Sequence, residues 1–140
     1  MKTYIGPTDE SQKEFYLQFK GKGPITMLNL VKFKPIAEYS GTGMPQVKER
    51  ISGREAYAKY LELTLPVMKK AGGNIKFYGR SGDFLIGPQN KGWDAVLLVE
   101  YESVDVFVAF AQSEAYLKNA GHRTASLEDS RLLPITASEL

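Results

Sequence analysis

The hydrophobic pattern of the chain is clearest in Pro24–Lys34, PITMLNLVKFK, where apolar residues occupy both alternating sets of positions. Successive side chains of a β-strand point to opposite faces of its sheet. The pattern therefore predicts a strand over residues 25–34 that is apolar on both faces. One amide, Asn29, lies on the same face as Met27 and Val31. A sheet built from such strands needs cover on both faces.

The rest of the chain predicts helices and further strands of ordinary length. Ser52 with Glu55 forms a capping box that begins a helix, and Gly72 with Gly73 ends it. The strand that follows is expected to pair with, or continue into, residues 84–86 through a turn at Ser81–Gly82. We predict helices over 8–20, 52–71, 104–111 and 113–117, and strands over 25–34, 75–80, 94–101 and 131–135.

One connection, Pro35–Ile51, shows no helical or strand period and contains Gly41, Gly43 and Pro45. Irregular connections of this length are uncommon and are often functional. We expect this segment to be a mobile lid over a pocket, or an arm that clasps a dimer.

The element order α–β–α–β–β–α–β predicts an α+β fold. Two β–α–β units with right-handed crossovers give a ferredoxin-like βαββαβ arrangement, with both long helices on one face of a four-stranded antiparallel sheet. The chain of 140 residues is expected to form one domain, residues 1–140, with residues 1–20 as an N-terminal helical extension. The apolar sheet face without helices predicts a homodimer, with a pocket between sheet and helices in each protomer.

Composition narrows the classes of partner and chemistry. The chain has 18 Lys and Arg against 16 Asp and Glu, and its basic residues are scattered in pairs, so no nucleic-acid partner is expected. The absence of cysteine excludes a thiolate nucleophile and Cys-ligated metals. Residues 1–7 contain no apolar segment and no apolar stretch is long enough to span a bilayer, so we predict a cytoplasmic protein without a membrane partner.

The first candidate catalytic residues are His122, the only histidine, and Arg123 beside it. Histidine is the natural proton shuttle near neutral pH. The alternative is a structural histidine at a helix end, where its charged form suits the helix dipole. One histidine is too little for a closed zinc site, so we predict no metal and no cofactor, although haem can be held by a single axial histidine.

The candidate substrate-binding residues are two polar side chains and three aromatic ones. Asn29 either bonds a neighbouring backbone or orients a ligand, and Arg80 either faces solvent or clamps a carboxylate. Tyr57 and Tyr60 fit a core stripe, yet their hydroxyls can also point into the pocket. Trp93 packs at a strand end or forms a pocket wall. The sequence has no phosphate-binding glycine loop and no serine nucleophile elbow.

Six segments in order, PITMLNLVKFK, SGREAYAKY, AGG, IGP, WDAVLLVEYES and HRTASLEDSRLLP, resemble the DUF1330 family of the dimeric α+β barrel superfamily. The likeness runs from about Pro24 to Ile135. It implies a ferredoxin-like homodimer, and the superfamily includes cofactor-free monooxygenases, lactone isomerases, polyketide cyclases and haem-binding enzymes. The family name states no activity.

Two functions remain open from the sequence. The first is a cofactor-free enzyme for proton transfer, oxygenation or isomerisation of a small carbonyl or phenolic compound, in which His122 moves the proton, Arg80 or Arg123 stabilises the anion and Asn29 sets orientation. The second is a non-catalytic small-ligand-binding or stress-response protein that uses the same pocket. Residue identities do not decide whether the protein is an enzyme.

Overall fold

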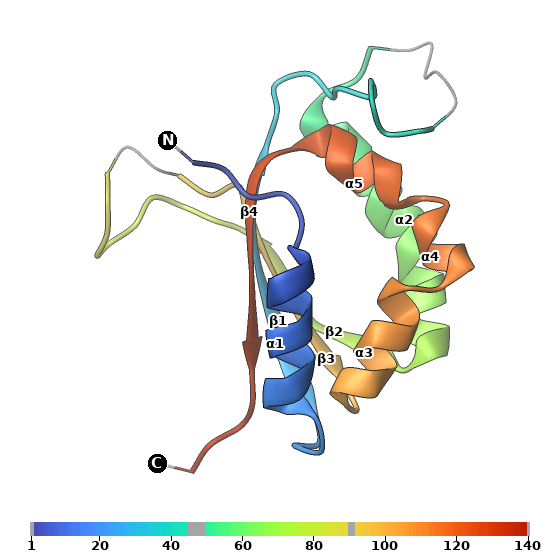
Figure 1. Ribbon diagram of the computed structural model, residues 1–140. Coiled ribbons are helices and arrows are strands. Elements are labelled where there is room, and N and C mark those ends of the chain that lie inside the picture. The colour runs from blue at the N-terminus through green and yellow to red at the C-terminus, as the bar shows by residue number, and fades with distance from the viewer. Residues whose placement is uncertain (1, 45–49, 90–91, 140) are drawn as a thin grey trace.

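The sheet is built from the apolar strands that the sequence predicts. The computed structural model describes residues 2–44, 50–89 and 92–139. Four antiparallel strands lie in the order β2-β3-β1-β4. All helices lie on one side of this sheet, which confirms the ferredoxin-like α+β fold and its extra N-terminal helix (Figure 1). The elements are α1 (Asp9–Phe19), β1 (Ile25–Phe33), α2 (Gly53–Ala71), β2 (Gly73–Arg80), β3 (Ala95–Tyr101), α3 (Val104–Ala111), α4 (Glu114–Leu117), α5 (Ala120–Ser126) and β4 (Leu127–Ile135).

Local side-chain chemistry sets most helix ends. Ser52 and Glu55 make the reciprocal capping box that begins α2, and Thr8 makes the same motif with Ser11 at α1. The helix α2 ends at Gly72, which adopts the left-handed conformation with φ of 103°. Glycine meets no steric cost there. These ends confirm the predicted starts of α2 and of the helices after Ser103 and Ser113.

Two predictions of secondary structure are wrong. Residues 84–86 form no strand, because none of the described residues between Arg80 and Ala95 belongs to the sheet. The strand expected over residues 131–135 begins four residues earlier, at Leu127, directly after the unpredicted helix α5. Helix α5 has seven residues and no side-chain cap, so its packing against α2 holds it rather than local propensity.

The core lies between the sheet and the helices. On β1 the residues Met27 and Val31 are buried, and the cross-strand partners of the same face, Val99 and Ala95, are buried with them. Aromatic rings from α1, α2, α3 and α4 fill much of the layer above. Among the described residues, no helix is both long and apolar enough to cross a membrane.

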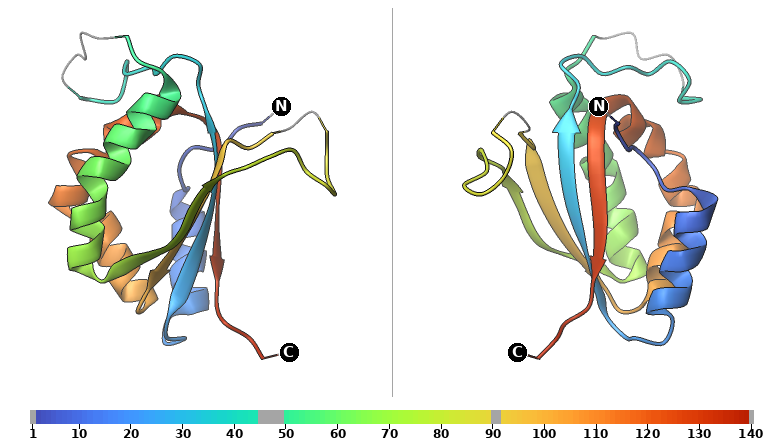
Figure 2. Two further views of the ribbon diagram at one scale, coloured as in Figure 1. Left: turned by 180° about the vertical axis from the view of Figure 1, so that it is seen from behind. Right: turned by 60° about the vertical axis from the view of Figure 1, so that its left-hand side comes forward.

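The opposite sheet face has no helix over it (Figure 2). The strand register places Leu28, Leu98, Phe77 and Leu133 in one row across all four strands on this face. Phe77 and Leu133 are each 56% exposed. An apolar row of this kind on a bare sheet face marks an interaction surface.

The connection between β1 and α2 is tied down at both described ends. Ala37 N–H donates to Ile51 O at 2.9 Å, and Glu38 N–H donates to Ala125 O at 2.9 Å. The predicted lid or arm spans Pro35–Ile51, of which residues 45–49 lie outside the described residues. Its first part, up to Glu38, is therefore part of the packed structure around α5.

Gly53, at the start of α2, lies against the backbone that follows β1 and the backbone at the end of α5. A Cβ at this position would meet Lys34 O, and would meet Ser126 O at 2.6 Å. Both atoms are backbone, so neither can move aside cheaply. We expect Gly53→Ala to lower the free energy of unfolding by about 1–3 kcal/mol in urea denaturation.

Gly82→Ala is the matched control, because a Cβ there meets nothing within 4 Å. Its free energy of unfolding should stay within about 0.5 kcal/mol of the wild type. Equal denaturation midpoints for the two variants would contradict this prediction, because they would mean that the junction has room for the added methyl group.

Candidate functional site

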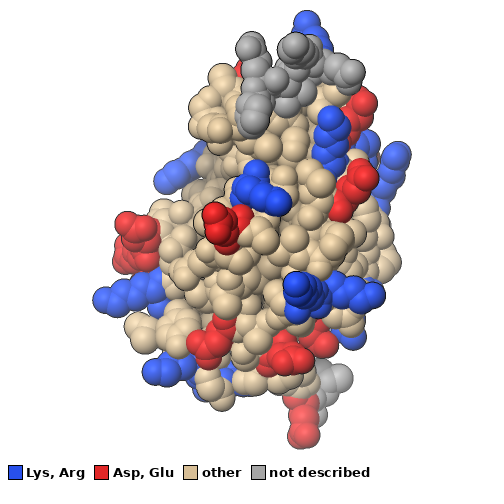
Figure 3. All heavy atoms as spheres, turned by 90° about the vertical axis from the view of Figure 1, so that its right-hand side faces the viewer, with Lys and Arg blue, Asp and Glu red and all other residues tan. Residues whose placement is uncertain are grey.

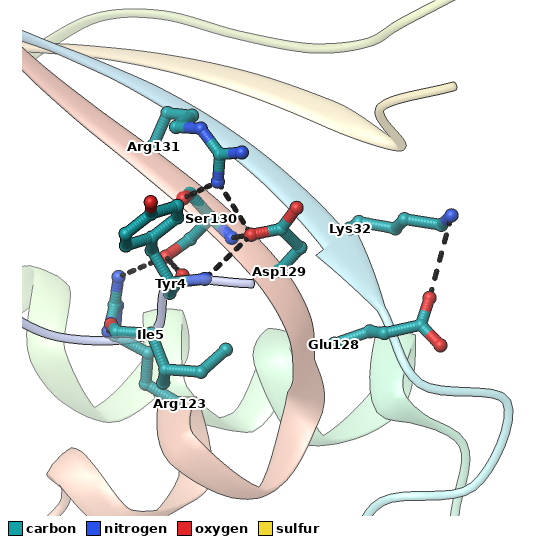
Figure 4. Close-up of polar contacts among 8 residues, drawn as sticks. All are labelled: Tyr4, Ile5, Lys32, Arg123, Glu128, Asp129, Ser130 and Arg131. Carbon is teal, nitrogen blue, oxygen red and sulfur yellow. Dashed lines mark hydrogen bonds and ion pairs between the residues drawn. The ribbon is translucent and has the colours of Figure 1, made fainter. Parts of the chain in front are cut away.

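Arg123 reaches from α5 toward the sheet and the N-terminal segment (Figure 4). Its Nη1 donates to Ile5 O at 2.7 Å, and its Nη2 donates to Ser130 Oγ at 3.5 Å. The side chain is partly buried, and within the described residues it forms no ion pair with a carboxylate. A positive charge with only neutral partners favours an added negative group nearby.

Two phenols of α2 lie close to this charge. Burial raises the pKa of Tyr57 and of Tyr60 far above the ordinary tyrosine value, and the positive charge of Arg123 partly offsets the rise in both. The Tyr60 hydroxyl lies 3.0 Å from the hydroxyl of Tyr116 in α4. Both phenols of α2 are therefore neutral near pH 7 and can donate hydrogen bonds to an anion.

Asn29 lies on the helix-facing side of the central strand β1. Its Nδ2 donates to Met27 O at 3.2 Å and to Leu97 O at 3.3 Å, so one half of the amide bonds the neighbouring backbone. Its flanking residues on this face, Met27 and Val31, are buried, while Asn29 keeps partial contact with solvent. Ser130, which Arg123 contacts, pairs with Val31. Asn29 is the next residue of β1 on the same face as Val31, so its side chain is a neighbour of the Val31–Ser130 pair that Arg123 contacts.

His122 is beside Arg123 in α5 but contacts a different part of the chain. Its Nδ1 lies 2.7 Å from the hydroxyl of Tyr39, and the two rings meet edge to face. Burial lowers the pKa of His122 below its ordinary value, and the nearby positive charge of Lys59 lowers it further. Burial also raises the pKa of Tyr39. The pair is therefore a neutral imidazole hydrogen-bonded to a neutral phenol near pH 7.

Two predicted residues lie away from this group. Arg80 is on the helix-facing side but at the far edge strand, and it is exposed. Three strand spacings, about 14 Å, separate its position from Ser130. Trp93 contacts Arg131, whose guanidinium carbon lies 5.2 Å from the centre of the Trp93 ring. Arg131 pairs with Leu30 across the strands, so its side chain lies on the sheet face without helices.

A buried carboxylate, Asp129, fastens the N-terminal segment beside Arg123 (Figure 4). It accepts hydrogen bonds from Tyr4 N–H at 2.9 Å and from Arg131 Nη1 at 2.6 Å. Burial alone would raise the pKa of Asp129, but these bonds and one from Ser130 N–H hold it below its ordinary value. The anchored segment holds Ile5 O within hydrogen-bond distance of Arg123 Nη1.

The structure brings Tyr57, Tyr60 and Arg123 together, with Asn29 near them on the same sheet face. The sequence analysis missed Tyr39 and Tyr116, which complete the contacts of His122 and Tyr60. Tyr39 is 83 residues from His122 in the sequence and lies in an irregular segment, so no periodic pattern pointed to it.

The exterior of the helical side carries charges of both signs in a mixed pattern (Figure 3). No single-sign surface is visible over the part of that side that the figure colours by charge. Within the described residues, no three potential metal-ligating side chains lie together.

Residues 46–134 match the family described as "Domain of unknown function (DUF1330)". This match spans more than half of the chain and most of the sheet and helices. The chain belongs to the DUF1330 family. No curated protein matches it.

A similar chain has been solved as a crystal structure, the RPA0582 protein of unknown function from Rhodopseudomonas palustris. It is 35% identical with a TM-score of 0.85, covering 99% of this chain and 100% of that chain. A methylated RPA0582 structure gives 37% identity and a TM-score of 0.88, covering 99% of this chain and 98% of that chain. The likeness extends beyond the matched family region to the N-terminal helix.

More distant structures share the fold alone. One is a dimeric protein of unknown function with a ferredoxin-like fold from Bacteroides fragilis, with 13% identity, a TM-score of 0.50 and coverage of 84% and 97% of the two chains. Another is hydroxynitrile lyase from Passiflora edulis, with 13% identity, a TM-score of 0.55 and coverage of 84% and 95%. A third is SnoaB, a cofactor-independent oxygenase from Streptomyces nogalater, with 14% identity, a TM-score of 0.50 and coverage of 84% and 96%.

The single histidine makes its titration measurable without ambiguity. We expect the NMR signals of His122 to titrate with a pKa below 6.5 in the folded protein, because burial and Lys59 disfavour the charged ring. A folded pKa at or above 6.5 would contradict the buried, neutral assignment.

The same shift has a consequence for stability. The unfolded chain binds the proton more readily than the folded one, so the free energy of unfolding falls as the pH drops below about 6.5. The His122→Gln variant lacks this contribution. Its free energy of unfolding should therefore fall less than that of the wild type between pH 7 and pH 5, measured by urea denaturation.

Proposed function

We propose that this DUF1330 protein is a cofactor-free enzyme that moves a proton on a small, partly apolar carbonyl or phenolic compound. The compound would lie between the sheet and the helices, beside Arg123 and the phenols of Tyr57 and Tyr60. The product of proton removal is an enolate or phenolate, which can rearrange to an isomer or react with oxygen. Enzymes on the same fold include a hydroxynitrile lyase and a cofactor-independent oxygenase.

The observation that carries the proposal is the partly buried guanidinium of Arg123, whose described partners are the neutral Ile5 O and Ser130 Oγ. A cation placed in advance where negative charge develops lowers the energy of an anionic transition state. The neutral phenols beside it supply hydrogen-bond donors without adding a competing negative charge. Asn29, partly accessible on the same face, would orient the carbonyl or hydroxyl group.

His122 contacts Tyr39 rather than the phenols of α2, and it is proposed as the base for the end of the compound that lies farther from Tyr57 and Tyr60. For its Nε2 to accept a proton, Nδ1 must carry the hydrogen and donate it to the Tyr39 oxygen at 2.7 Å. Proton transfer then breaks a C–H or O–H bond of the substrate, places the hydrogen on Nε2 and leaves the electron pair in the enolate or phenolate. The lowered pKa keeps the imidazole neutral and ready to accept near pH 7.

Deuterium exchange into a weakly acidic ketone tests this activity without oxygen or a cofactor. We expect the protein to speed exchange at the carbons beside the carbonyl of phenylacetone in D₂O, followed by proton NMR. His122→Gln should slow this exchange by about 10²-fold, since a positioned base contributes that much. Arg123→Gln should slow it by a similar factor, with Arg123→Lys between that variant and the wild type.

Tyr39→Phe distinguishes the two tautomers of His122. If Nδ1–H donates to Tyr39, loss of the acceptor removes a bond that also favours the charged ring, so the pKa of His122 falls further. A rise in that pKa would mean that Tyr39 donates and that Nε2 already carries the hydrogen, which would end the role of His122 as base. Binding of the ketone without any exchange would instead favour the non-catalytic binding protein.

We also propose that the protein is a homodimer that buries the sheet face without helices. The row Phe77, Leu98, Leu28 and Leu133 supports this assembly, because burying it removes a large apolar surface from water. The distant Bacteroides fragilis neighbour with the same fold is a dimer.

Leu28→Asp tests the dimer, because Leu28 lies in the central strand of that row. An unpaired charge in an apolar interface is costly, so the dimer dissociation constant should rise at least about 100-fold. Sedimentation equilibrium at micromolar concentration measures it. Leu63→Asp, at a 43% exposed position of α2, is the control and should leave the mass unchanged. A monomeric wild type would contradict the proposal.

A further inference from the structure

The connection between β2 and β3 carries the most exposed aliphatic residues in the described chain. Leu85 is 98% exposed and Ile86 is 91% exposed. The segment Ser81–Gln89, called the arm below, projects away from the body on the side of the sheet that has no helices, as Figure 1 and the left view of Figure 2 show. Two adjacent aliphatic side chains held out in water are unfavourable in an isolated protomer.

The base of the arm is held to the sheet. Ser81 N–H donates to Asp94 O at 3.1 Å, and Asp94 N–H donates to Val31 O at 2.8 Å. The Asp94 carboxylate also accepts a hydrogen bond from Phe33 N–H at 2.7 Å. The direction in which the arm leaves the sheet is therefore set by the central strand β1.

The tip of the arm has a shape of its own. Phe84 packs over Gly87, since a Cβ on Gly87 would lie 2.8 Å from the Phe84 ring. Gly87 has φ of 154°, and Pro88 follows it. Phe84 thus turns back onto the arm, while Leu85 and Ile86 point outward. The arm therefore has a defined shape that presents two aliphatic side chains to solvent.

We propose that the arm docks on a second copy of this chain, with Leu85 and Ile86 covering an edge strand of the partner. This inference rests on the homodimer proposed above. About six residues, Ser81–Ile86, lead from the sheet to the tip and can span up to roughly 20 Å. Two sheets packed face to face lie only about 10 Å apart. The arm is therefore long enough to pass the interface and lie beside the partner's sheet.

The edge strands β2 and β4 offer a matching apolar surface. Leu132 on β4 is 45% exposed and Tyr78 on β2 is 48% exposed, and both lie on the helix-facing side of the sheet edges. Ile135 on β4 is 39% exposed and lies on the side without helices. An edge strand with exposed apolar side chains is a surface that proteins usually cover. Two-fold symmetry lets each protomer give one arm and receive the other.

The double variant Leu85→Asp with Ile86→Asp tests the docking. We expect the dimer dissociation constant to rise at least about tenfold, because two unpaired charges would replace apolar side chains in the contact. Thermal stability at high dilution should stay at the wild-type value, because neither side chain packs in its own protomer. Leu17→Asp is the matched control, because Leu17 lies in α1 and is 63% exposed. It should leave the dissociation constant unchanged.

Cross-linking adds a second readout, because the chain contains no cysteine. Leu85→Cys carrying a photoactivated cross-linker should give covalent dimers, with cross-linked peptides from β2 or β4 of the other protomer. Cross-links confined to one protomer, or a dissociation constant unchanged in the double variant while Leu28→Asp still dissociates the dimer, would overturn the arm and leave the dimer intact. A monomeric wild type would overturn both.

A membrane surface is the other class of partner that an exposed aliphatic tip suits. Co-sedimentation with phosphatidylcholine–phosphatidylserine vesicles, lost in the double variant while the dimer dissociation constant stays unchanged, would overturn docking on a second copy. Absence of vesicle binding together with the weakened dimer supports it.

Discussion

The hydrogen bonds of the Lys34 backbone hold together the three elements on which the candidate site depends. Lys34 N–H donates to Ser126 O at the end of α5, and Lys34 O accepts from Gly53 N–H at the start of α2. One residue directly after β1 thus joins both helices to the sheet. The close approach works only because Gly53 has no side chain. Together with the packing of α5 on α2, this junction fixes the places of His122 and Arg123.

The parts of the fold that could be predicted from the sequence are those set by local chemistry. Period-2 apolar patterns located β1 and β3, and serine caps located the starts of α2, α3 and α4. Helix α5 was missed because it has no cap hydrogen bond and is held by long-range packing on α2. Residues 84–86 are apolar, but they belong to an exposed arm and not to a strand of the sheet. Apolar residues alone do not say which surface they will cover.

The residues of the candidate site also divide into those that could be predicted from the sequence and those that could not. Asn29, Tyr57 and Tyr60 could be picked out because their residue types sit on predictable faces of a strand and a helix. Arg123 was picked out only because it is next to the single histidine, since the helix that carries it was not predicted. Tyr39 could not, since an irregular segment brings it to His122 across 83 residues of sequence. Arg80 shares the sheet face with Asn29 but not its neighbourhood, because strand order rather than strand pattern decides lateral distance. Lateral order is a property of the whole chain, so single motifs do not encode it.

The N-terminal segment has a consequence for how this family can diversify. Arg123 bonds Ile5 O, and Asp129 fastens Tyr4, yet both backbone groups belong to a region that precedes the matched family residues 46–134. A chain that shared the fold but lacked residues 2–7 would expose the Arg123 guanidinium to more water, where its field is more strongly screened. Evolution can therefore retune the electrostatics of one arginine by lengthening or trimming a terminus. No residue of the sheet or of α2–α5 has to change.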